Sequence, residues 1–101
     1  MREYKIKKGY EATSERLEEL LRKHFGNFSF ENGYYVVRNF GGIEELKAKI
    51  EKKSLLIETK TRVIDNETSV KTLKAYNSFL EEFTGYTAKE RQKMLKKEVE
   101  G

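Results

Sequence analysis

The sequence contains no cysteine, which excludes a disulfide framework, a zinc site built on thiolates and catalysis by a thiol. No apolar run approaches the length of a membrane span or of a signal-peptide core. Histidine occurs once, as His24. From these absences we expect a soluble, cytoplasmic protein with no membrane partner.

The composition of the 101 residues fits one globular domain, since 37% are hydrophobic and 12% aromatic. A chain of this length buries roughly two-thirds of its unfolded surface in a single core. The net charge of +4 is unevenly distributed, because residues 1–8 and residues 88–98 each sum to +3 and leave −2 for the rest. Any basic surface must therefore come from the two ends of the chain.

The first two predicted elements are a strand and a helix. In "EYKIKK", Tyr4 and Ile6 alternate with charged residues, which is the period of a half-buried strand. In "TSERLEELLRKHFG", Thr13 or Ser14 is placed to cap an amphipathic helix, and Gly26 is placed to end it.

A hairpin is predicted in "NFSFENGYYVVRNF", because an Asn-Gly pair between apolar runs favours a two-residue turn with positive φ at both positions. The turn pairs Glu31 with Tyr34. The register that follows sets Phe30 opposite Tyr35 and puts both side chains on the core face.

Residues 43–51 fit a helix face and a strand face equally well, and this alternative stays open in the sequence. We favour a strand over residues 45–51, because a turn near Lys52-Lys53 would set Ile50 against Leu55 and Ala48 against Ile57. Residues 54–64 alternate clearly and are rich in β-branched residues, so they predict a strand.

Two helices close the chain. Asn66 and Thr68 are candidate caps of the first helix, whose apolar residues recur at helical spacing at positions 70, 73, 76, 80 and 83. Gly85 ends it, and Thr87 with Glu90 forms a capping box for the second helix. That last helix, over residues 87–99, has a thin apolar stripe, so we expect it to dock loosely.

The fold class that follows is α+β, in a single domain spanning residues 1–101. The element order is β-α-β-β-β-β-α-α, with an antiparallel five-stranded sheet and helices packed on one face. The predicted core consists of nine residues: Phe28, Phe30, Tyr35, Val37, Ile50, Leu55, Ile57, Leu73 and Leu80.

Both ends of the chain carry a resemblance. The segments "REYKIKKGY" and "FLEEFTGYTAKERQKMLKK" are similar to the signature ends of an uncharacterised family of small archaeal proteins, about 100 residues long and of unknown function. The resemblance implies the fold above and an archaeal, cytoplasmic setting. It implies no chemistry.

The residue types that carry chemistry are not arranged for it. His24 lies in the last turn of a predicted helix beside leucines, where a structural role is the simpler interpretation. No spaced motif supports a metal site, a cofactor site or a nucleophile. We therefore expect no catalysis, no metal and no cofactor.

Two surfaces are candidates for binding. The first is the sheet face opposite the helices, where an aromatic ring and cations would lie together: Tyr34, Val36, Arg38, Lys47, Lys49, Lys60 and Arg62. The second is a basic arm on the last helix: Lys89, Arg91, Lys93, Lys96 and Lys97. The arm is a weak candidate for nucleic acid, because acidic residues dilute its charge.

Three hypotheses follow. The protein is a non-enzymatic interaction module that forms a homo-oligomer, such as a dimer, through its sheet; the apolar residues of that face would be Tyr34, Val36, Leu56 and Ile64. The alternative is binding of single-stranded RNA or DNA through the sheet face and the basic ends. A second alternative is a small-molecule binder with a cavity between the sheet and the long helix.

Overall fold

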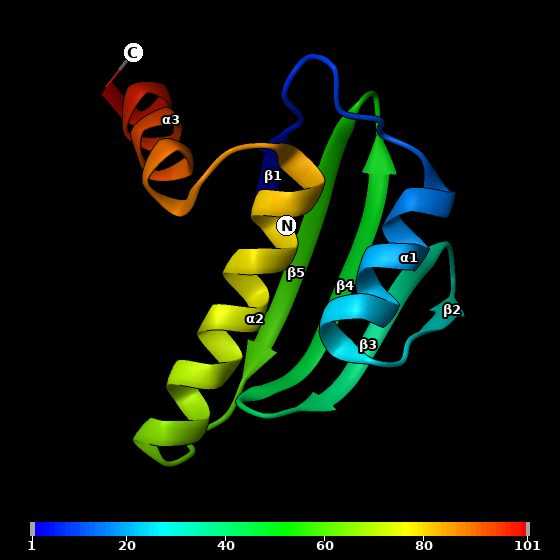
Figure 1. Ribbon diagram of the computed structural model, residues 1–101, viewed down its shortest axis with the longest axis vertical. Helices are drawn as coiled ribbons and strands as arrows, with labels where there is room; N and C mark the ends of the chain where they lie inside the picture. The colour runs from blue at the N-terminus through cyan, green and yellow to red at the C-terminus, as the bar shows by residue number, and fades with distance from the viewer. Residues whose placement is uncertain (1, 101) are drawn as a thin grey trace.

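A computed structural model describes the backbone of residues 2–100 and the side chains of residues 2–94 (Figure 1). Its elements follow the predicted order: β1 (Arg2–Lys5), α1 (Ser14–Phe25), β2 (Ser29–Glu31), β3 (Tyr34–Phe40), β4 (Ile43–Glu51), β5 (Ser54–Thr61), α2 (Asn66–Thr84) and α3 (Ala88–Glu100). The five strands form one antiparallel sheet in the order β1-β5-β4-β3-β2. The predicted α+β class is confirmed, and residues 43–51 are a strand.

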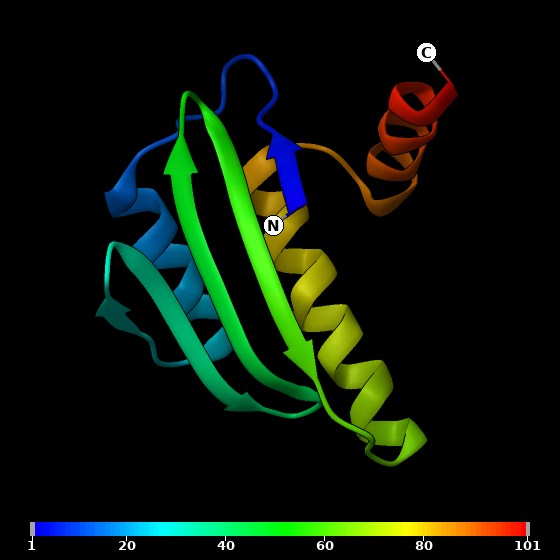
Figure 2. The same ribbon diagram turned by 180° about the vertical axis from the view of Figure 1, so that it is seen from behind.

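The helices α1 and α2 lie on one face of the sheet, and the other face is seen without a helix across it in Figure 2. The helix α3 lies beyond the β1 side of the sheet, away from both faces. Over the described residues, no helix is both long enough and apolar enough to cross a membrane.

Two tight turns set the register as predicted. Asn32 and Gly33 have φ values of 52° and 84°, and Lys52 and Lys53 have values of 49° and 63°. Positive φ at both central residues is the signature of the type I′ hairpin turn, whose twist matches that of the strands. The pairs Phe30–Tyr35 and Ile50–Leu55 are both present.

A bulge near the β3–β4 turn changes which residues face the helices. The β4–β5 register shifts between Ile43 and Glu45, and Asn39 on β3 has a φ of 56°. One extra residue reverses the alternation of side chains. As a result Phe40 and Ile43 reach the same core as Val37, although strict alternation would point them away.

Local capping explains where the helices begin. The side chain of Thr13 accepts from the Arg16 N–H at 3.3 Å. Asp65, rather than the predicted Asn66 or Thr68, caps α2. These side chains occupy backbone N–H groups that the first helical turn leaves unpaired. The predicted capping box of α3 is confirmed, since Thr87 and Glu90 exchange side-chain to backbone hydrogen bonds at 3.0 and 3.2 Å.

The core lies between the sheet and the helices α1 and α2. Of the nine predicted core residues, four are buried and three are partly buried: Val37, Leu55, Ile57 and Leu80, then Phe28, Tyr35 and Ile50. The predictions for Phe30 and Leu73 are wrong, since these side chains are 62% and 59% exposed. Phe30 has the expected register, but its edge strand lies outside the cover of the helices. Leu73 lies on a side of α2 that does not pack on the sheet, whereas Phe79 is fully buried.

Candidate interaction surfaces

The helix-free face of the sheet carries most of the residues that the sequence proposed for binding. The alternation of each strand places ten charged side chains on this face: Glu3, Lys5, Glu31, Arg38, Glu45, Lys47, Lys49, Glu51, Glu58 and Lys60. Five are cations and five are carboxylates, so the strands contribute no net charge to it. A surface that binds polyanions concentrates positive charge, and this face does not.

Arg38 is held by two carboxylates. Its guanidinium nitrogen donates to Glu31 at 3.0 Å, and its Nε donates to Glu45 at 3.3 Å. The hydrogen bond from Arg38 is the main reason that the pKa of Glu31 falls from 4.5 to about 2. The second, smaller cause is the hydroxyl of Ser29, which donates to the same carboxylate at 2.6 Å.

The lysines of β4 have partners as well. Lys47 Nζ lies 3.7 Å from Glu45, and Lys49 Nζ lies 3.2 Å from Glu51. Lys49 also lies 5.1 Å from the ring centroid of Tyr34, so this ring faces a lysine rather than open solvent. The predicted aromatic platform is therefore occupied by the protein's own cation.

Three of the residues assigned to this face behave differently. Val36 points outward but is only 2% exposed, because long charged side chains surround it and cover apolar surface with their stems. Arg62 turns back to the β3–β4 turn, where its Nε donates to the Gly41 carbonyl at 3.0 Å. Ile64, expected on the same face, instead lies against Gly42 and the groove beside α2.

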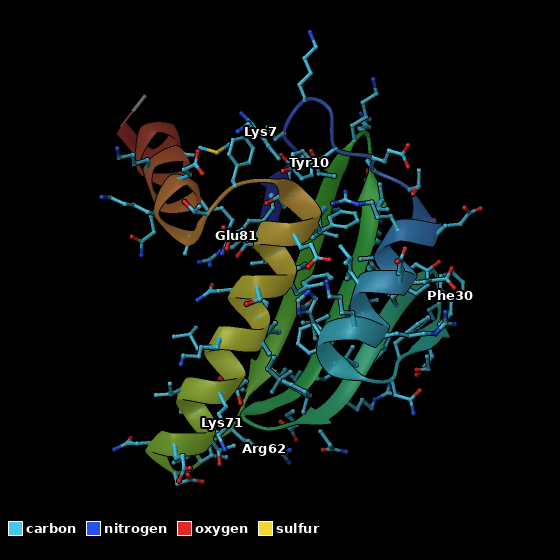
Figure 3. All side chains as sticks on the ribbon, in the orientation of Figure 1. Lys7, Tyr10, Phe30, Arg62, Lys71 and Glu81 are labelled. Carbon is cyan, nitrogen blue, oxygen red and sulfur yellow. The ribbon has the colours of Figure 1, made fainter. Side chains whose placement is uncertain are left out.

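The β2 edge of the sheet carries an exposed aromatic side chain, labelled in Figure 3. The ring of Phe30 contacts Tyr35, with 5.0 Å between ring centroids, yet 62% of the side chain is accessible to solvent. Within the described chain, β2 has a single neighbouring strand, β3. An unpaired edge with an exposed large apolar residue is a site where another chain can add.

The opposite edge is only half covered by the part of the chain that the structure describes. β1 pairs with residues 54–57 of β5, and β5 continues to Thr61. Beside this uncovered part lies an open groove of about 380 Å³. Its lining comes from β5, the β3–β4 turn and α2: Gly42, Ile43, Thr59, Thr61, Arg62, Ile64, Ser69, Thr72, Leu73 and Tyr76. The groove lies between the sheet and the long helix, where the third hypothesis from the sequence expected a cavity. The signal for the free edge available in the sequence was the difference in length between the predicted strand in "EYKIKK" and the predicted strand over residues 54–64.

The two basic ends of the chain meet at one corner of the molecule. The backbone N–H of Lys7 donates to the Thr84 carbonyl at 2.8 Å, and Lys7 Nζ lies 5.8 Å from the ring centroid of Tyr86. The pKa of Glu90 is lowered, chiefly by its hydrogen bonds with Thr87 and to a smaller extent by Lys7 and Lys93. The N-terminal loop and the start of α3 therefore share one electrostatic environment.

Arg91 is not a free cation of a basic arm. It is only 7% exposed, donates to the Tyr86 carbonyl at 2.6 Å and donates to Asn77 Oδ1 at 3.1 Å. Lys89 and Lys93 are exposed as predicted. The side chains of Lys96 and Lys97, the other predicted members of the arm, lie outside the described residues.

Buried polar groups near α2 form a small network. The hydroxyls of Tyr4 and Tyr76 lie 3.4 Å apart, and Arg2 donates to Tyr4 at 3.3 Å. Burial, followed by the hydrogen bond with Tyr4, raises the pKa of Tyr76.

His24 Nε2 is buried 3.4 Å from Glu82 Oε1, outside hydrogen-bond geometry. Among the described residues, no group of three or more acidic or histidine side chains could hold a metal ion.

Comparison with known proteins agrees with this fold. The solution structure of a hypothetical protein, TA0095 from Thermoplasma acidophilum, is similar at 30% sequence identity and a TM-score of 0.61. The similarity covers 94% of this chain and 97% of that chain. No curated protein matches. A family model described as a domain of unknown function, DUF5611, matches residues 1–97, and the chain belongs to this family.

Proposed function

We propose that this protein is a non-enzymatic interaction module that self-associates through its sheet, by pairing the β2 edges of two copies. The observation that carries the proposal is the exposure of Phe30 on an unpaired edge strand. Sheet edges of monomeric proteins are normally protected by charge or by covering elements. A large exposed aromatic side chain on such an edge therefore favours its burial against a second chain.

The backbone at Phe30 is suited to the pairing. In a two-residue hairpin the residues that flank the turn, Glu31 and Tyr34, form a hydrogen-bonded pair. Peptide groups alternate in direction along a strand, so the N–H and C=O of Phe30 point away from β3. Two copies related by a two-fold axis at Phe30 would exchange two hydrogen bonds between these groups.

A second copy is the partner that fits, because a two-fold axis sets each residue against itself or its symmetric counterpart. Phe30 on the axis meets an identical ring, which apolar contact favours. Ser29 meets Glu31 of the second copy, a neutral donor against a carboxylate. No like charges meet within residues 29–31. The pairing segment is short, so we expect a dimer whose population depends on protein concentration.

Sedimentation equilibrium over a concentration series tests this proposal. The parent protein should rise from 11.9 kDa towards twice that mass. Phe30→Glu, which sets two carboxylates together on the axis, should stay monomeric. Val63→Ser is the matched control, because Val63 is fully exposed but lies beyond β5 at the other side of the sheet. A parent that remains at 11.9 kDa, or a Phe30→Glu variant that still dimerises, contradicts the proposal.

Nucleic-acid binding is the second candidate function, and one observation moves it from the sheet face to the corner where the ends meet. Lys7, Lys89 and Lys93 are exposed in this region, where Lys7 lies over the ring of the half-buried Tyr86. Retention of single-stranded RNA should fall steeply with salt, since each phosphate contact releases counterions. Lys7→Gln with Lys93→Gln should reduce it, and Lys47→Gln with Lys49→Gln should not. Equal retention by all variants contradicts this candidate.

A further inference from the structure

The second sheet edge, at β5, has its own unpaired backbone groups. The N–H of Arg62 donates to the Gly42 carbonyl at 2.9 Å, which points this peptide group towards β4. Because peptide groups alternate along a strand, the N–H and C=O of Thr59 and Thr61 point the opposite way, to the open edge. β1 covers this edge only as far as Ile57, which pairs with Arg2. Among the described residues, a continuous strand position is therefore open beside Thr59 and Thr61.

The groove beside this edge supplies an apolar side. The hydroxyl of Thr72 accepts from the Gly42 N–H at 2.9 Å and donates to the Thr68 carbonyl at 2.7 Å, so it is already satisfied. Leu73 and Ile64 then provide apolar lining, and Leu73 is 59% exposed. Side chains of an added strand that point towards α2 would be apolar to fit this lining.

The other side of the same edge is charged. Glu58 and Lys60 point to the helix-free face, whereas the guanidinium of Arg62 is turned to the Gly41 carbonyl and the Asn39 side chain at the β3–β4 turn. Lys60 borders the open position, so the outward side chain of an added strand that lies beside it fits best when it is acidic. The groove thus combines three requirements: an extended backbone, apolar residues in alternation, and a carboxylate between them beside Lys60.

A second copy of this chain does not meet the steric requirement. The helix α2 runs along this edge on the helix-bearing face of the sheet, as both ribbon views show. Paired strands lie about 4.8 Å apart, whereas packed helices need about 8–10 Å between axes. A second β5 would bring its own α2 into the same space. An extended segment carries no helix and avoids this clash.

We propose that this edge binds an extended segment of a partner protein as a sixth strand, antiparallel to β5 and in line with β1. The segment places apolar side chains towards Leu73 and a carboxylate beside Lys60. Main-chain hydrogen bonds to Thr59 and Thr61 supply affinity, and the alternation supplies specificity, as in other cases of strand addition. The site is independent of the β2 edge, so it stands whether or not the protein dimerises.

The test uses the peptide acetyl-Val-Glu-Val-Glu-Val-amide, titrated into ¹⁵N-labelled protein up to about 1 mM, the range of weak peptide binding. Amide shifts should change first at Thr59 and Thr61. Thr61→Pro removes an edge N–H and should weaken binding about tenfold, while Thr61→Val, which keeps that N–H, should bind as the parent does. The control peptide acetyl-Val-Val-Glu-Glu-Val-amide has the same composition without the alternation and should not bind.

Three results would overturn the proposal. The first is that the amides of Thr59 and Thr61 do not respond to the peptide. The second is that Thr61→Pro binds the peptide as well as Thr61→Val does. The third is that both peptides bind equally and change only the signals of Leu73, as expected of a simple apolar cavity. Since Thr61→Pro could impair folding, its ¹⁵N spectrum without peptide is recorded first. If it is unfolded, Leu73→Asp takes its place, with loss of binding expected. The mass in solution, measured separately, tests whether two copies pair through their β2 edges.

Discussion

Arg91 donates a hydrogen bond to Asn77 Oδ1 at 3.1 Å, and this contact joins α3 to α2. The same guanidinium donates to the Tyr86 carbonyl in the connection between the two helices. Burial lowers the pKa of Arg91, while the nearby Tyr4, Tyr76 and Glu81 act in the opposite direction. The cation expected to reach out to a polyanion is instead a link within the domain.

Replacement of Arg91 by Met should therefore loosen the start of α3. Hydrogen bonds from a charged group contribute about 1.5–3 kcal/mol, so we expect a loss of this order in the free energy of unfolding of α3. Amide hydrogen exchange should accelerate across residues 88–94. Lys93→Met is the matched control, since Lys93 is exposed on the same helix. Equal exchange in both variants would show that Arg91 does not hold α3.

Two phenylalanines, Phe79 and Phe30, should differ greatly in their effect on stability. Phe79 is fully buried and contacts the rings of Phe25 and Phe83, so Phe79→Ala should cost about 3–5 kcal/mol. Phe30→Ala should cost less than about 1 kcal/mol in dilute solution, as surface changes do. Urea denaturation measures both. A loss at Phe30 comparable to that at Phe79 would mean that the edge is covered in the monomer.

The hydroxyl of Thr72 should be essential to the β3–β4 turn. Thr72→Val leaves the buried N–H of Gly42 without its acceptor, which costs about 1–3 kcal/mol. Thr72→Ser keeps the hydroxyl and should cost less. Urea denaturation of both variants, with the exchange rate of the Gly42 amide, makes the comparison. Equal stability of the two variants would assign the role of Thr72 to packing alone.

The acid titration of Glu31 should depend on Arg38. The pKa of Glu31 is lowered from 4.5 to about 2, so its contribution to stability is present above pH 4.5 and is lost as the pH falls through 2. Arg38→Gln should move the pKa back towards 4.5 and make the loss of stability over this pH range less steep. Carbon-detected NMR titration of the Glu31 carboxyl measures the shift directly.

A control separates this effect from a general change in charge. Lys23 of α1 lowers the pKa of Glu82 of α2 through a hydrogen bond. Both helices lie on the face of the sheet opposite to that of Arg38. Lys23→Gln should raise the pKa of Glu82 and leave that of Glu31 unchanged. If Glu31 still titrates near pH 2 in Arg38→Gln, the hydroxyl of Ser29 is the dominant cause.

Local signals predicted the elements and register of this fold, because turn residues and alternation act over short distances. The pairs Phe30–Tyr35 and Ala48–Ile57 follow from two turns alone. Alternation does not say where a helix lies above the sheet. Phe30 and Val37 share one face, yet only Val37 is buried, since α1 covers β3 through contacts such as Phe25 with Phe40, at 5.0 Å between ring centroids.

The packed face of α2 was predicted only in part, for a related reason. Leu80 and Phe83 are buried as their spacing predicted, but Val70 and Leu73 are exposed. The helix buries Thr72 and Phe79 as well. A threonine does not contribute to the apolar spacing of a helix. The buried position of Thr72 depends on its hydroxyl, which accepts from the Gly42 N–H thirty residues away in the sequence. Arg91 is similar, since its acceptors Asn77 and Tyr86 become visible only in three dimensions. Alternation correctly placed Arg38, Lys47 and Lys49 on the helix-free face of the sheet. It did not predict that carboxylates of the same face pair with these cations.

The cancellation of charge across the helix-free face leaves the positive excess to the rest of the molecule. The strands contribute no net charge there, so the excess of +4 lies elsewhere. Lys7 and Lys89 contribute exposed positive charge at the corner where the N-terminal loop meets the start of α3. A protein of this kind orients as it approaches a charged surface. On a cation-exchange resin it would adsorb by that corner, with the sheet facing the mobile phase.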